Sequence, residues 1–291
     1  NTAIGAFALE SNTSGTKNTG VGVGALYRNL TGNENTAFGA TSLHENLTGS
    51  YNTGIGCKSL TSNTNGEKNT ALGYETLYNN TSGSSNTALG YNVLTANSTG
   101  HSNTAAGYQA LKTNSTGFSN TAIGNRALAV TTTGSDNTAI GDSALSGNTT
   151  GIMNTGLGAN ALKNNTTGTH NTAVGFNTLV LNNDGDRNTA VGYMSLNKNT
   201  GDDCTAMGYG SLSNNTGGTA NTAFGAFSLM ANTSGNNNTA SGRHALASNT
   251  TGNGNTANGS HTLAANTSGT SNTAIGADAL KANTTGNFNT A

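Results

Sequence analysis

The chain has 291 residues with 42 Gly, no Pro, no Trp, only 8% charged residues and a formal net charge of -1 at pH 7. The near-neutral charge and the lack of a basic run argue against nucleic acid as a partner. No apolar stretch of about 18 residues occurs, so no membrane insertion is predicted. Such a polar composition is typical of disordered chains, but here the residues recur in fixed columns.

A repeat of 17 residues organises the whole sequence. Repeats that open with Asn-Thr start at residues 1, 18, 35, 52, 69, 86, 103, 120, 137, 154, 171, 188, 221, 238, 255, 272 and 289, and the repeat at 204 opens with Cys204 instead. The repeat 188–203 has 16 residues. We therefore predict one continuous array over residues 1–291, a fragment of a longer fibrous chain.

We number the positions of each repeat from its first residue. Position 2 is always Thr, positions 5 and 15 are always Gly, and position 9 is always Leu. Position 3 is Ala or Gly, position 4 is apolar except at Ser241 and Asn258, and position 12 is Asn except at Thr131. Fixed columns of this kind indicate that one structural element is stacked on itself.

Seventeen residues are too few for a pair of helices or a leucine-rich repeat, but they fit one coil of a parallel β-solenoid. In the first repeat the pattern predicts a strand over residues 2–5, a second strand ending at Leu9, and an Asn/Gly turn over 12–15. Later repeats follow the same order. The lack of Pro agrees with backbone hydrogen bonds between coils. The predicted fold is all-β, a parallel β-solenoid of 17 coils.

Strand alternation predicts that positions 3 and 4 point to opposite faces, as do positions 8 and 9. We expect Ala3, Gly5 and Leu9 to face inward, although the opposite arrangement, with positions 4 and 9 inside, stays open. The predicted core ladder comprises Leu9, Leu26, Leu43, Leu60, Leu77, Leu94, Leu111 and Leu128. The predicted inter-chain stripe comprises Ile4, Val21, Phe38, Ile55, Leu72, Leu89, Ile123 and Ile140. A stripe of this size would need a partner.

Polar columns predict ladders as well. Asn at positions 1 and 12 would form side-chain amide ladders, and Thr at position 2 a hydroxyl ladder. Aromatic residues fill position 6 in consecutive repeats, namely Tyr74, Tyr91 and Tyr108, then Phe176, Tyr193 and Tyr209. Two interpretations stay open: a surface that binds a sugar or receptor, and simple stacking or a seam between chains.

No motif predicts catalysis, a metal site or a cofactor. His244 and His261 share position 7 in neighbouring repeats, but no carboxylate or Cys joins them there. Cys57 and Cys204 lie too many coils apart for a disulfide, so isolated thiols are expected. Asn-x-Ser/Thr sequons begin at position 12 in twelve repeats, and crowding would allow glycans on a subset at most.

The stretch "NTAIG", present at 120–124 and 137–141, resembles the "SVAIG" core motif in the head repeats of YadA-like trimeric autotransporter adhesins. The full pattern "NTAxGxxALxxNTTGxx" resembles arrays in bacterial and phage tail-fibre-like proteins. The resemblance covers the whole chain. It implies a left-handed β-roll, a homotrimeric fibre and an extracellular, cell-surface or phage or virion tail-fibre location. The adhesin repeats are shorter, and they carry Val where this chain has Thr at position 2.

Taken together, these features predict a structural extracellular fibre or adhesin shaft, a rigid rod with no catalytic activity, for which a host surface, a glycan or a receptor is a candidate partner. One alternative is an ice-binding β-solenoid that uses its Thr and Asn ladders, although the large residues at position 4 interrupt the Thr-x-Thr pattern of such proteins. A further alternative is a self-assembling cell-surface filament.

Overall fold

The computed structural model describes all residues 1–291 and contains seventeen β-strands and no helix. The chain forms two compact units, residues 1–150 and 151–291, which we describe separately. The first unit contains β1 (Thr2–Ile4), β2 (Thr19–Val21), β3 (Thr36–Phe38), β4 (Thr53–Ile55), β5 (Thr70–Tyr74), β6 (Thr87–Tyr91), β7 (Thr104–Tyr108), β8 (Thr121–Ile123) and β9 (Thr138–Ile140). The second unit contains β10 (Thr155–Leu157), β11 (Thr172–Val174), β12 (Thr189–Val191), β13 (Thr205–Met207), β14 (Thr222–Phe224), β15 (Thr239–Ser241), β16 (Thr256–Asn258) and β17 (Thr273–Ile275).

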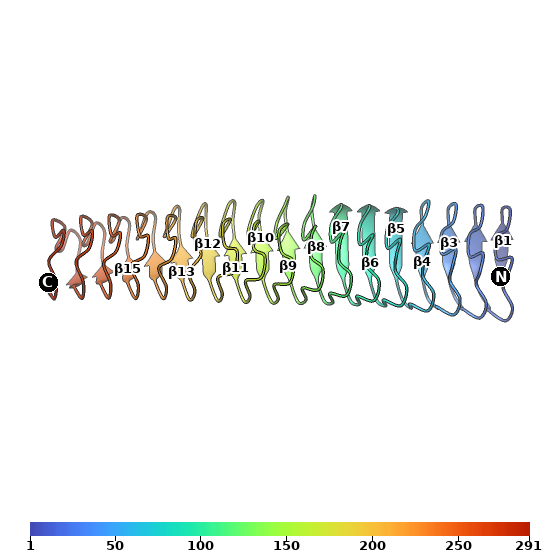
Figure 1. Cartoon of the computed structure of the whole chain (residues 1–291). Coiled ribbons are helices and arrows are strands. Elements are labelled where there is room, and N and C mark those ends of the chain that lie inside the picture. Colours follow the sequence, from blue (N-terminus) through green and yellow to red (C-terminus); the bar gives the residue numbers. More distant parts are fainter. The chain divides into compact units, whose positions relative to one another are not determined.

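Within each unit, every coil supplies one strand to a parallel sheet (Figure 1). The pairing is in register with the repeat, so that Thr2 lies opposite Thr19 in the first unit and Thr155 opposite Thr172 in the second. The 16-residue coil keeps this register, since Thr189 pairs with Thr205. The prediction of a parallel β-solenoid is therefore confirmed.

The second strand predicted in each coil is wrong, because positions 7–11 form turns and bends in its place, and only β5, β6 and β7 extend to position 6. Positions 7, 9 and 17 have a left-handed backbone in all seventeen coils, for example φ of 60° at Phe7 and 54° at Leu9. Side chains alternate only along an extended strand. Positions 8 and 9 consequently both point inward, and Ala25 and Leu26 are each fully buried. The expectation that these two positions face opposite sides is also wrong.

The left-handed backbone at position 17 allows its conformational strain to be measured, as the change in the free energy of unfolding when that residue is replaced by Gly. A left-handed conformation costs a residue with a side chain about 1 to 2 kcal/mol, and Ser85 adopts it with φ of 59°. Gly254 occupies the same position with φ of 65°. We expect Ser85→Gly to raise the free energy of unfolding by about 0.5 kcal/mol, because the relieved strain exceeds the added freedom of the unfolded chain. Urea titration would measure this.

Ser62→Gly is the matched control for that substitution. Ser62 lies in a turn position without positive φ. A glycine there relieves no strain and adds freedom to the unfolded chain, so it should lower stability slightly. Equal shifts for both variants would show that the left-handed backbone at Ser85 carries no measurable strain.

The interior of each coil is lined by small residues at position 3 and by Leu at position 9. The structure places the whole predicted Leu core ladder inside: Leu9 is 9% exposed, and Leu26, Leu43, Leu60, Leu77, Leu94, Leu111 and Leu128 are fully buried. Ala at position 3, such as Ala37 and Ala71, is also fully buried. Small residues on the strand leave room for Leu across a narrow interior.

The Gly column at position 5 has a different cause from the one expected. These glycines do not line the interior. A Cβ atom at Gly22 would lie 2.6 Å from the carbonyl oxygen of Gly39 in the next coil, and Gly22 has φ of +131°. Close approach of two backbones and a conformation that only Gly adopts readily together fix this column.

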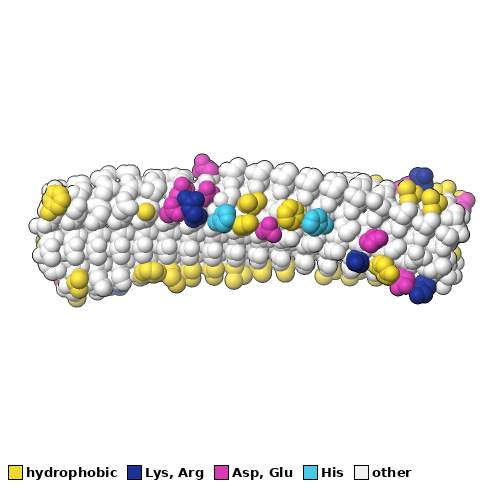
Figure 2. All heavy atoms as spheres, turned by 90° about the horizontal axis from the view of Figure 1, so that it is seen from below, with side chains coloured by type: hydrophobic (Ala, Val, Ile, Leu, Met, Phe, Trp, Pro, Cys, Tyr) yellow, Lys and Arg dark blue, Asp and Glu magenta, His cyan; other side chains and the backbone are white.

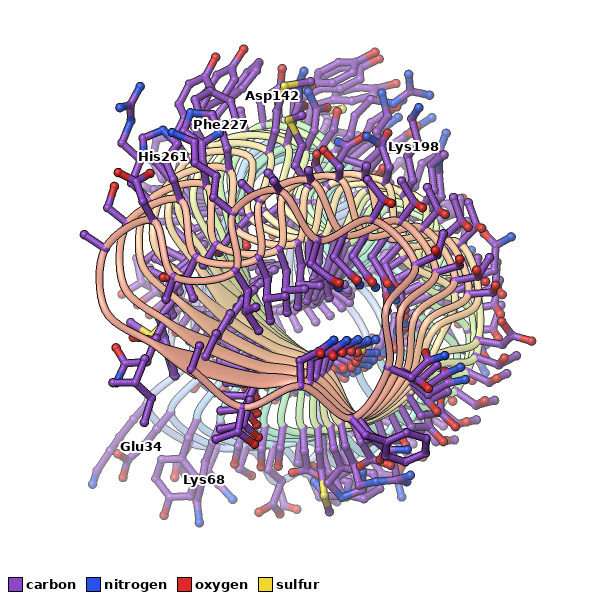
Figure 3. All side chains as sticks on the ribbon, turned by 90° about the vertical axis from the view of Figure 1, so that its left-hand side faces the viewer. Glu34, Lys68, Asp142, Lys198, Phe227 and His261 are labelled. Carbon is purple, nitrogen blue, oxygen red and sulfur yellow. The ribbon has the colours of Figure 1, made fainter.

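Two amide ladders complete the interior. At position 12, Asn97 Nδ2 donates to Asn80 Oδ1 (2.8 Å) and to the Gly100 carbonyl (2.9 Å), and Asn114 repeats both bonds one coil further on. At position 1, Asn18 accepts from the next Asn backbone N–H through Oδ1 (2.9 Å) and donates to the Gly32 carbonyl. Figure 3 shows these nitrogen and oxygen atoms as rows inside the coil. The predicted amide ladders are present.

The position-12 ladder is interrupted where the repeat departs from its pattern. Thr131 stands in for Asn and donates from Oγ1 to the Asn148 carbonyl (2.9 Å), which leaves Asn114 Oδ1 buried without a donor. In the 16-residue coil, Asn199 bonds the Gly201 carbonyl, and Asn182 Oδ1 likewise lacks a donor. Departures from the repeat therefore cost hydrogen bonds at identifiable atoms.

Candidate functional site

The side chains at position 4 lie on the outer face of the strands and are mostly apolar. We call them the apolar row. Its predicted members are exposed, from 36% at Ile140 to 60% at Ile4. These exposed members are Ile4, Phe38, Ile55, Leu72, Leu89, Ile123 and Ile140, and Val21 is half-buried. The alternative arrangement with position 4 inside is thus wrong. In Figure 2 hydrophobic side chains gather along one edge of the view, while the face toward the viewer is mostly polar.

Beside the apolar row, position 2 carries Thr on every strand. These residues are half-buried or exposed on the same outer face. The hydroxyl bonds between coils form mainly at position 13, where Thr13 Oγ1 donates to the Leu30 carbonyl (2.7 Å) and Thr64 Oγ1 to the Thr81 carbonyl (2.9 Å). The hydroxyl ladder expected at position 2 is therefore replaced by hydroxyl-to-carbonyl bonds elsewhere in the coil.

Both predicted aromatic groups form ladders. In the first unit, ring centroids are 5.4 Å apart for Tyr74–Tyr91 and 5.5 Å for Tyr91–Tyr108, with nearly parallel planes. In the second unit, the Phe176–Tyr193 and Tyr193–Tyr209 centroids are 5.6 and 5.0 Å apart. Each such pair contributes about 0.5 to 1.5 kcal/mol. Stacked rings occupy each other's faces, so these faces are not free for a sugar.

The second ladder continues beyond the predicted residues. Tyr209 meets Phe227 edge to face at 5.1 Å, and Phe227 stacks on His244, which stacks on His261. Here the ladder passes from position 6 to position 7. Phe227 and His261 project from the same side of the coil in Figure 3. Sequence reasoning missed this extension because it compared only residues within one column.

The two stacked histidines lie beside each other with no third metal-ligating side chain grouped with them. The His244 and His261 ring centroids are 5.2 Å apart. No group of three or more metal-ligating side chains occurs in the structure. Burial lowers the pKa of His244 below its usual value, and the charges of Arg243 and His261 add to that effect. The pair belongs to the aromatic ladder.

Some charged residues pair between successive coils. Lys17 Nζ lies 3.0 Å from Glu34, and Arg187 Nε lies 2.7 Å from Asp203. The hydrogen bond from Lys58 lowers the pKa of Glu75. Exposed pairs of this kind add little to stability, because water and salt screen the attraction. These pairs show that side chains at variable outer positions also interact with the residue at the equivalent position of the next coil.

Both cysteines are free thiols in contrasting settings. Cys57 is exposed and Cys204 is buried. Cys204 occupies position 1, and its Sγ lies 3.4 Å from the carbonyl oxygens of Asp202 and Gly218. Burial raises the pKa of the Cys204 thiol to about 11.

We expect a thiol reagent at pH 8 to modify Cys57 quickly and Cys204 only after unfolding, because the thiolate is the reactive species. The folded-state pKa of Cys204 lies above the unfolded value of 9.0. Its contribution to stability is thus complete below about pH 9 and is lost as the pH rises through about 11. Mass spectrometry of the labelled chain would show one adduct when folded and two in denaturant. Two rapid adducts on the folded chain would contradict the buried position of Cys204.

The sequons at position 12 coincide with the buried amide ladder. Asn97 and Asn148, for example, are fully buried. A glycan on Asn97 Nδ2 would replace one of the two N–H groups that form its two hydrogen bonds. A fully buried asparagine at position 12 has no room for a glycan in the folded coil, and among these sequons only Asn12 and Asn283 in the terminal coils are half-buried.

No protein-family model, curated protein or solved structure matches this chain. The structure contains no helix with the length and apolar character needed to cross a membrane.

Proposed function

We propose that this chain is a segment of a structural extracellular fibre or adhesin shaft, a rigid rod that projects or provides a surface-binding region and performs no catalysis. One observation carries the proposal. Among the invariant positions, Gly at 5 and 15 lies close against the next coil and Leu at 9 lies in the interior, whereas most residues at the variable positions 6, 7, 10, 11, 16 and 17 lie on the outside. A sequence constrained in this way preserves a stacked scaffold and leaves its surface free to vary.

A homotrimer is part of the proposal. The apolar row keeps residues such as Leu89, Ile123 and Leu157 between 42% and 47% exposed. A row of exposed apolar residues within each unit is a liability for an isolated soluble chain. The resemblance to trimeric adhesin head repeats supports three copies as the arrangement that covers it, and an extracellular, cell-surface or tail-fibre location.

Sedimentation equilibrium tests this proposal through the mass of the assembly. The chain has a mass of 28.9 kDa, and we expect a species three times as heavy. Ile140→Ser should weaken the assembly without unfolding the coil, because Ile140 is exposed and Ser241 occupies the same position in β15. Leu145→Ser should unfold the coil, because Leu145 is fully buried. A stable monomer of the unsubstituted chain would contradict the trimeric shaft.

A second candidate function is ice binding, which the Thr row at position 2 favours. Parallel pairing sets Thr2 opposite Thr19 and Thr36 opposite Thr53 on one outer face. Neighbouring strands are about 4.8 Å apart, so these residues form a regular row. A thermal-hysteresis assay distinguishes the two functions: a shaft shows none, and an ice-binding solenoid shows a concentration-dependent gap between melting and freezing.

A further inference from the structure

A notch opens in the second unit where position 7 lacks a side chain. Gly210 occupies that position, which holds Met194 in the preceding coil and Phe227 in the following one. The resulting notch has a volume of about 330 Å³. We call it the Gly210 notch. It is the place on this ladder where a missing side chain makes room for a ligand beside aromatic rings.

Aromatic side chains form the walls of the Gly210 notch, and residues with small side chains form its floor. Tyr209 and Phe227 line it, and their rings meet edge to face at 69° rather than in a parallel stack. Gly210 and Ser213 contribute the small side of the notch. The perpendicular arrangement leaves a ring face uncovered by its neighbour, and flat apolar surfaces of this kind suit the face of a pyranose ring.

Polar groups surround the notch. Asn197 Nδ2 donates to the Asn177 carbonyl (2.9 Å) and Asn214 Nδ2 to the Met230 carbonyl (3.0 Å). Each amide is thereby fixed in orientation, and each keeps its side-chain oxygen as an acceptor for ligand hydroxyl groups. A few placed polar groups around an apolar surface are typical of sites for small ligands.

Lys198 gives the notch its charge. It lines the Gly210 notch, and no carboxylate lies within 4.0 Å of its Nζ. Lys17, Lys58 and Arg187, in contrast, pair with carboxylates in adjacent coils. Lys198 and Phe227 project from the same side of the coil in Figure 3. An ammonium group without a partner beside an apolar notch complements a carboxylate.

We propose that the Gly210 notch binds a pyranose residue that carries a carboxylate, with the ring against Tyr209 and Phe227 and the carboxylate at Lys198. This inference goes beyond the proposed shaft and does not depend on it. A monomeric chain that binds the sugar would contradict the trimeric shaft but would support the proposed binding at the notch.

The first unit supplies a matched control. Gly24 also occupies position 7, and a notch of about 220 Å³ lies between Phe7, Tyr27 and His44. No Lys or Arg lines this second notch. His44 Nδ1 lies 2.8 Å from Glu45 Oε1, so the imidazole there already has an acidic partner. The two notches share a missing side chain and aromatic walls but differ in free positive charge.

The test measures binding of methyl β-D-glucuronide and of uncharged methyl β-D-glucoside to the full chain by saturation-transfer NMR titration. We expect weak binding of the glucuronide and at least about tenfold weaker binding of the glucoside, which corresponds to loss of one charged contact. Lys198→Gln should weaken glucuronide binding by about the same factor. Equal binding of the two sugars, or no binding of the glucuronide, would overturn the inference.

Gly210→Asn should abolish glucuronide binding, because a Cβ atom at Gly210 already lies 3.2 Å from Phe227 Cδ1 and the amide would fill the notch. The backbone accepts Asn, since Asn160 and Asn177 occupy position 7 with φ of 58° and 54°, close to the 61° of Gly210. Gly24→Asn should leave binding unchanged. Loss of binding in Gly24→Asn together with normal binding in Gly210→Asn would place the sugar elsewhere. Thermal unfolding of each variant would show that the coils remain folded.

Discussion

Gly90→Ala is expected to unfold the coils around β6, with a loss of at least about 3 kcal/mol in local stability. Gly90 has φ of +132°, and a Cβ atom there would overlap the carbonyl oxygen of Gly107 in the next coil. A side-chain movement can relieve neither the positive φ nor the overlap, because the position of the backbone fixes both. The stacked coil must open for the substitution to be accommodated.

Hydrogen exchange followed by mass spectrometry would locate this effect. Peptides that cover β5 to β7 should exchange much faster in Gly90→Ala, whereas peptides from β14 to β16 should change little, because each coil contacts only its neighbours. Gly217→Ala is the matched control. A Cβ atom at Gly217 meets nothing within 4 Å, and its φ is not positive. Unchanged protection around β6 in Gly90→Ala would rule out the close backbone approach at position 5.

Asn97→Ala should cost about 2 to 4 kcal/mol. Asn97 Nδ2 is the donor to Asn80 Oδ1, and Asn97 Oδ1 accepts from Asn114 Nδ2 (2.8 Å). Removing the amide leaves buried groups in two neighbouring coils without their partners, and it adds a cavity at a fully buried position. Chemical denaturation monitored by circular dichroism would measure the loss. A variant as stable as the unsubstituted chain would show that the ladder is dispensable.

Thr131→Asn is the reverse experiment at a natural interruption of the same ladder. Asn114 Oδ1 lacks a donor there, and an amide at position 131 would supply one. We expect a gain of about 1 kcal/mol. The two substitutions change the same kind of contact in opposite directions, so stability changes of the same sign would contradict the proposed role of the amide ladder.

Much of the fold could be predicted from the sequence because stacking imposes identity from coil to coil. A residue such as Leu94 must fill the same space as Leu77 and Leu111 on either side. Asn80 must meet an identical amide on the next coil to form a ladder. These constraints act between residues 17 positions apart and are visible as columns. The inward direction of Ala3 and Leu9 and the outward direction of Ile4 followed from the same logic.

The turns could not be predicted in this way, because backbone conformation at positions 7 and 9 leaves little trace in the residues. Leu26 has a left-handed backbone with φ of 53°, but a Leu residue in the sequence does not predict that conformation. A weak signal existed at Gly24, Gly210 and Gly254, which occupy left-handed positions outside the invariant Gly columns. Gly adopts positive φ more readily than other residues, so an occasional Gly in a variable column indicates a position with positive φ.

The candidate binding site was predicted only in part. Tyr209 belongs to the predicted aromatic surface and lines the Gly210 notch. The other predicted aromatic residues stack on one another, and stacked faces are unavailable. The notch depends on the absence of a side chain at Gly210 and on the change of column from Tyr209 to Phe227. Comparing single columns could not reveal either feature.

Residues 17 positions apart lie on adjacent coils, and a disulfide between introduced cysteines tests this directly. Asn125 Nδ2 donates to Asp142 Oδ1 (3.0 Å), and adjacent strands lie about 4.8 Å apart, within reach of a disulfide. In a chain with Cys57→Ser and Cys204→Asn, mild oxidation of the dilute folded protein should join Cys residues introduced at 125 and 142. Cys residues introduced at 108 and 142, two coils apart, should stay reduced. Failure of the first pair to join, or joining of the second, would contradict the stacked register.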